Sequence, residues 1–88
     1  MPQITPLGVA RQTTLMAQRV SDAVEDALNT IGPESEERIT DARLFTKEIE
    51  LWIEYADKQG WIHVSKHGDA QLVLALGALE RLDLYRTF

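Results

Sequence analysis

Apolar residues recur at intervals of three and four along much of this 88-residue chain, and this spacing predicts amphipathic helices. The series is clearest within residues 34–59, and a second one falls within residues 7–31. Gly32-Pro33 separates them, because glycine suits the end of one helix and proline the first turn of the next. We therefore predict two helices, 7–31 and 34–59, that form a long antiparallel hairpin, with residues 1–6 as an extended lead-in. The two apolar faces comprise Met16, Val20, Ala23, Val24, Ala27 and Ile31, and Ile39, Ala42, Phe45, Ile49, Trp52, Ile53 and Ala56.

The predicted lengths of these helices constrain the shape of the molecule. At about 1.5 Å per residue, each helix would be roughly 37–39 Å long. A compact domain of 88 residues has a diameter of only about 31 Å. Either one helix breaks, or the molecule is elongated and has a long lateral surface.

Residues 61–69 are predicted to interrupt the helices. Gly60 suits a helix end, and residues 61–65 are aromatic or β-branched in the main, which favours an extended conformation. Residues 66–68 would form a turn and Asp69 would cap a third helix over 70–85. The predicted fold is therefore all-α, a single helical domain over residues 1–88: a helical hairpin plus a third apolar helix, in a three-helix bundle with one short extended segment at 61–65.

The third helix contains the longest apolar run of the chain, residues 72–79. A helix that is apolar on every side needs burial on every side, and two neighbouring helices cannot cover all of it. We therefore expect an interface there, most simply with a second copy, because a two-fold axis lets one apolar surface cover itself. The alternative is that some of these residues are simply exposed. The expected interface residues are Leu72, Val73, Leu74, Leu76, Gly77, Leu79 and, at the preceding turn, Trp61.

Composition restricts the classes of function. The net charge of −5 opposes binding to phosphate backbones and anionic membranes. With no cysteine, neither a disulfide nor a thiolate zinc site is available. The first residues lack the features of a secretory signal, and the longest apolar run is too short to cross a bilayer. We expect a cytoplasmic protein that does not contact the membrane.

The sequence contains no recognisable catalytic arrangement. His63 and His67 are the only histidines, and across a strand and a turn their spacing would not suit a metal ion. Ser65 would share a strand face with His63, but no acid nearby in sequence could orient the histidine. No phosphate-binding loop or cofactor motif occurs. We expect no enzyme activity, no cofactor and no metal.

A small basic cluster supports an alternative function. Lys58, His63, Lys66 and His67 lie within ten residues of an otherwise acidic chain. If residues 61–74 formed a β-hairpin, the protein would have the form of a winged-helix DNA-binding regulator with Lys66 at the wing tip. The leucine and alanine content of 72–79 and the overall charge argue against this. A third possibility is an acidic inhibitor of a nucleic-acid-binding protein. The leading hypothesis is a protein–protein interaction module, serving as an adaptor, regulator or assembly subunit.

Overall fold

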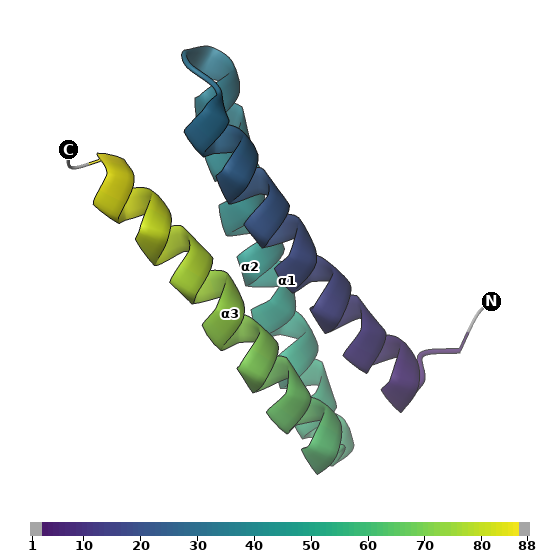
Figure 1. Cartoon of the computed structure of the whole chain (residues 1–88). Helices are drawn as coiled ribbons and strands as arrows, with labels where there is room; N and C mark the ends of the chain where they lie inside the picture. The colour runs from purple at the N-terminus through teal and green to yellow at the C-terminus, as the bar shows by residue number, and fades with distance from the viewer. Residues whose placement is uncertain (1–2, 87–88) are drawn as a thin grey trace.

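The computed structural model describes residues 3–86, which form three helices in one up-down-up bundle, so that α1 and α3 run parallel to each other and antiparallel to α2 (Figure 1). They are α1 (Pro6–Asn29), α2 (Pro33–Gln59) and α3 (Ile62–Arg86), and each packs against both others. No strand occurs in this part of the chain. The predicted all-α three-helix bundle is confirmed.

The hairpin of α1 and α2 follows the predicted signals, with an earlier end to α1. Thr5 caps α1, because its hydroxyl accepts a 3.0 Å hydrogen bond from the amide of Gly8. Helix α1 ends at Asn29, and Thr30 is extended, so Ile31 is exposed and does not continue the apolar face. Gly32 has a φ of 100°, which only glycine adopts readily, and Pro33 begins α2. The expected lead-in is seen at residues 3–5, while Met1 and Pro2 lie outside the described residues.

The turn between α2 and α3 is tighter than predicted. Gly60 adopts the left-handed conformation, with a φ of 76°. Its amide donates a hydrogen bond to the carbonyl of Asp57 (3.1 Å). The amide of Trp61 donates one to the carbonyl of Ala56 (3.0 Å). These two bonds make a Schellman motif, which satisfies carbonyls at the end of α2. The carbonyl of Trp61 then accepts from the amide of Ser65 at 3.0 Å, which starts α3 immediately.

The predicted extended segment 61–65, the turn 66–68 and the cap at Asp69 are therefore wrong, because α3 begins at Ile62. A strand there would leave its amides and carbonyls without partners, whereas the helix satisfies them internally. Side-chain contacts also favour the helix. The hydroxyl of Ser65 donates to the carboxylate of Asp57, and Ser65 and Gly68 are buried.

The molecule is elongated, as the helix lengths predicted. Its backbone extends over 43 × 26 × 15 Å, with a radius of gyration of 14.2 Å. A compact chain of this length would have a radius of gyration of about 12 Å. No helix breaks, so the bundle has long lateral faces on which every helix is partly open to solvent.

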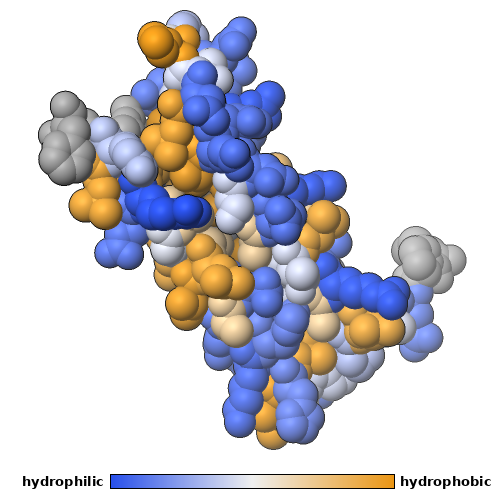
Figure 2. Space-filling model, in the orientation of Figure 1, coloured by the Kyte–Doolittle hydropathy of each residue, from blue (hydrophilic) through white to orange (hydrophobic). Residues whose placement is uncertain are grey.

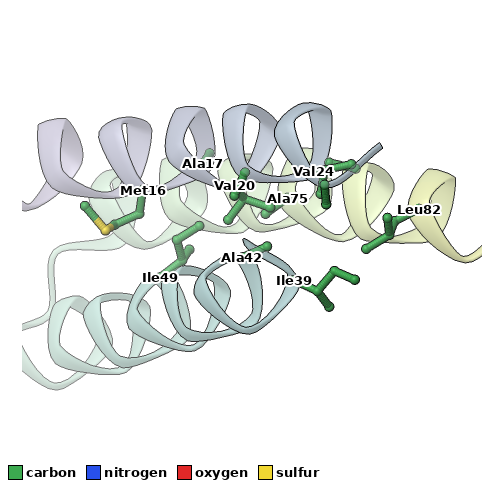
Figure 3. Close-up of a cluster of buried hydrophobic side chains, with 12 residues drawn as sticks. Met16, Ala17, Val20, Val24, Ile39, Ala42, Ile49, Ala75 and Leu82 are labelled. Carbon is green, nitrogen blue, oxygen red and sulfur yellow. The ribbon is translucent and has the colours of Figure 1, made fainter. Parts of the chain in front are cut away.

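The core between the helices consists largely of small residues (Figure 3). Six of the twelve buried residues of the central cluster are alanines. The larger ones include Met16, Val20, Ile49 and Leu82, which project between the helices. Small residues let helix axes approach closely, but each contributes little apolar area to the core. The six alanines are Ala17, Ala23, Ala27, Ala42, Ala75 and Ala78.

At Gly68, α3 packs closely against the hairpin. A Cβ atom added there would lie 2.6 Å from Cγ1 of Ile53 and 3.7 Å from Cγ2 of Thr13. The first distance is well below van der Waals contact, and Cγ1 of a β-branched side chain moves little. Gly77, nine residues further along α3, has no atom within 4 Å of the same position.

We predict that Gly68→Ala and Gly77→Ala change the free energy of unfolding differently. Both gain about 1 kcal/mol of helix propensity, but only Gly68→Ala adds a clash, of about 1–3 kcal/mol. The difference between the variants therefore isolates the clash. Urea unfolding at protein concentrations low enough for a monomer measures it. Equal stabilisation of both variants would contradict the close packing at Gly68.

Candidate protein-binding surface

The leucines of this protein lie mostly on its surface. Eight of the eleven are exposed, two are half-buried and only Leu82 is buried. Single exposed leucines are ordinary in soluble proteins. A protein that has most of its leucines on the surface and most of its alanines in the core is unusual. The exposed ones are Leu7, Leu15, Leu28, Leu44, Leu51, Leu74, Leu76 and Leu84.

The side of α3 that faces away from the other two helices carries one continuous row of residues, which we call the outer stripe. Its apolar members include Val73, whose side chain is 68% exposed. Apolar side chains are visible at the surface along α3 (Figure 2). Spacings of three and four keep the whole row on one face. The outer stripe consists of Ile62, Lys66, Asp69, Ala70, Val73, Leu76, Gly77, Glu80 and Leu84.

The residues predicted for the interface divide into two groups in the structure. Val73, Leu74 and Leu76 are exposed, and Gly77 is half-buried with open space at its Cα. Leu72 and Leu79 instead pack against the core cluster. Since the helix turns by about 100° per residue, a run of eight apolar residues necessarily points both inward and outward.

The area of the molecular surface is large for a chain of this mass. Its solvent-accessible surface is 6164 Å², whereas a compact 10.0 kDa monomer has about 5,200 Å². The excess of about 900 Å² is close to the roughly 800 Å² that each partner buries in a standard protein–protein interface. The elongated shape therefore leaves more surface open to solvent than a compact chain of the same mass would.

Trp61 belongs to an aromatic cluster at the α2–α3 turn. Its ring lies 5.8 Å from that of Tyr55 at 70°, and the ring of Tyr55 lies 5.9 Å from that of Trp52 at 82°. These are edge-to-face contacts, which stabilise aromatic pairs beyond the area they bury. All three residues are half-buried. Trp61 thus packs back on α2 and helps to close the turn, away from the outer stripe.

The basic residues do not form a wing, because residues 61–74 are helical rather than a β-hairpin. Lys58 lies at the end of α2 and forms an ion pair with Glu54, at 3.1 Å. In α3, His67 faces α1, where its Nε2 lies 2.7 Å from the hydroxyl of Thr14. His63 and Lys66 are exposed. The winged-helix architecture is therefore wrong.

The two histidines are four residues apart on a helix, which corrects the expected strand and turn geometry. This spacing places both side chains on one side of α3. Within residues 3–86, however, no three potential ligands among His, Cys, Asp and Glu come together. Ser65 donates to Asp57, which ties the start of α3 to the end of α2. Among the described side chains, every buried polar atom has a hydrogen-bond partner.

Two further apolar surfaces were missed in the sequence. Leu44 and Leu51 are exposed on the outer face of α2, outside its core-facing stripe. Their spacing of seven residues, or two helical turns, was the available signal. Near the start of α1, Leu7 and Leu15 line a shallow groove together with Arg11, Thr14 and His67. The groove depends on how α1 meets α3, which the sequence does not encode locally.

Comparisons of the chain with protein-family models, with curated proteins and with solved structures find no match. None of the helices, over the described residues, is sufficiently long and apolar to span a membrane. The surface itself is therefore the basis for a functional assignment.

We predict that truncating two leucines of α3 has very different effects on the free energy of unfolding. Leu82→Ala should lower it by about 2–5 kcal/mol, because it opens a cavity among buried side chains. Leu74→Ala should change it by no more than about 0.5 kcal/mol, because Leu74 is 61% exposed and lies outside the outer stripe. Chemical denaturation of the two variants tests the orientation of α3, and similar losses would contradict it.

Proposed function

We propose that this protein is a non-enzymatic protein–protein interaction module, an adaptor, regulator or assembly subunit, and that it forms a homodimer through the outer stripe of α3. The observation that carries the proposal is the exposure of Val73 and Leu76 in the middle of a long helix face. Exposed apolar side chains grouped on one face are a feature of interaction sites in soluble proteins.

Self-association accounts for the composition of this face. A second copy presents the same apolar row, so that the two rows bury each other around a two-fold axis. Gly77 supports a close approach, since no atom lies within 4 Å of the position of a Cβ there. In the interior of a helix, glycine costs about 1 kcal/mol relative to alanine, so a helix contact at this position offers a reason for it.

The absence of enzymatic activity is part of the proposal. Ser65, His63 and His67 all lie in the first half of α3, and Ser65 and His67 contact Asp57 and Thr14 respectively. The Ser65 contact involves no histidine. The Thr14 contact does join a hydroxyl to an imidazole, at 2.7 Å, but within the described residues no acid hydrogen-bonds to the other ring nitrogen of His67 to orient it as nucleophilic catalysis requires. The same residues are accounted for by the packing of α3 on the hairpin.

We predict a mass of twice the 10.0 kDa of the chain in solution. Light scattering after gel filtration, over a hundredfold dilution, measures it. The double variant Val73→Glu, Leu76→Glu should weaken the dimer by at least about a hundredfold, because like charges facing one another cost several kcal/mol. Its helix content, followed by circular dichroism, should remain that of the wild type.

The matched control is Leu44→Glu, Leu51→Glu, which places the same charges on exposed leucines of α2. It should leave the dimer intact. A wild-type monomer at every concentration would refute the proposed self-association. A dimer that resists the α3 substitutions and is dissociated by the α2 substitutions would place the interface on α2 instead.

A further inference from the structure

The outer stripe of α3 is self-complementary when it is reversed, and we infer that the two copies pair antiparallel with Val73 at the two-fold axis. The inference rests on the proposed self-association and names its geometry. The occupant of this face is a second copy of the same chain. The evidence is the position of the charged and the small residues within the stripe.

Residues at equal distances from Val73 meet in such a pair. Seven residues before it is Lys66 and seven after it is Glu80, so each lysine faces a glutamate of the other copy. Within the described residues neither takes part in an ion pair, and both are exposed. The arrangement therefore provides two interchain ion pairs at no cost to existing ones.

The large and small apolar positions also match in size. Eleven residues from Val73 lie Ile62 and Leu84, so a large apolar residue meets another at each end. Closer to the axis, the small Ala70 faces Leu76. Small residues opposite large ones let two helices interdigitate without voids.

Other ways of pairing two outer stripes bring like charges together or leave a charge without a partner. In a parallel pair each residue faces its own counterpart, which brings Lys66 against Lys66 and Glu80 against Glu80. Antiparallel pairs displaced by one heptad place Lys66 or Glu80 against Val73, where a charge loses its hydration without gaining a partner. Of these arrangements, only the register centred on Val73 pairs Lys66 with Glu80 and aligns the apolar ends, with Asp69 opposite Gly77.

Charge reversal tests the register with an internal rescue. Lys66→Glu and Glu80→Lys should each weaken the homodimer by roughly tenfold to a hundredfold, since each turns two attractive pairs into two repulsive ones. An equimolar mixture of the two variants should form a heterodimer of near wild-type affinity, because both of its pairs again join opposite charges. Sedimentation equilibrium of each variant and of the mixture, with one copy labelled, measures these affinities.

Disulfide crosslinking gives a second, independent test. The chain has no cysteine, so each introduced cysteine is the only one in its chain. Val73→Cys should form a disulfide-linked dimer under mild oxidation, because the two positions meet at the axis. Ile62→Cys should not link to itself, since its two copies would lie about 33 Å apart along the helices. Mixed with Leu84→Cys, however, it should give a heterodimer.

The outcomes separate the geometry from the association itself. Efficient self-linking of Ile62→Cys, with no rescue in the charge-reversal mixture, would establish a parallel dimer and overturn the inference while the proposed function stands. A dimeric wild type that links at none of these positions would place the interface elsewhere, and would overturn it as well. A wild type that remains monomeric would refute both.

Discussion

The close contact of the helices through alanine and glycine is the constraint on which the rest of this structure depends. Ala42 of α2 and Ala75 of α3 are fully buried, and Gly68 touches Ile53 so closely that a methyl group would not fit. Beside these residues, a leucine between the helices would have no space. The chain therefore places most of its leucines outside, with Leu82 as the one buried leucine, and its core contains many small side chains.

That constraint also explains which parts of the fold could be predicted. The core-facing stripe of α2, its start at Pro33 and its end at Gly60 depend on local signals, and they were predicted correctly, whereas α1 ends two residues before the predicted position. Residues 61–69 were not predicted correctly. Their β-branched and aromatic side chains suit strands, but the Schellman turn and the contact of Gly68 with Ile53 make them helical. This contact joins residues fifteen apart, so no local pattern reveals it.

The incorrect prediction for residues 61–69 also affected the residues expected at the interface. The apolar run 72–79 correctly indicated a helix too apolar for two neighbours to cover. Which of its residues face outward depends on the rotation of α3 about its axis, and that is set by packing at Ser65, Gly68 and Leu82. Leu72 and Leu79 turned inward for this reason. Ile62, Lys66 and Asp69 joined the outer stripe only because their segment is helical.

The charges within the outer stripe affect whether two copies of an acidic protein can associate through an apolar face. Two copies with a net charge of −5 repel one another, yet the stripe itself has one lysine against one aspartate and one glutamate, a net charge of −1. Approach along α3 therefore meets less repulsion than the net charge of the chain alone would produce. An unbroken row of leucines would bind many apolar surfaces. Lys66 and Glu80 lie at equal distances from Val73, so a partner surface must carry opposite charges at the same two positions. Few other surfaces do, and charges in an interface discriminate between partners more than they increase affinity.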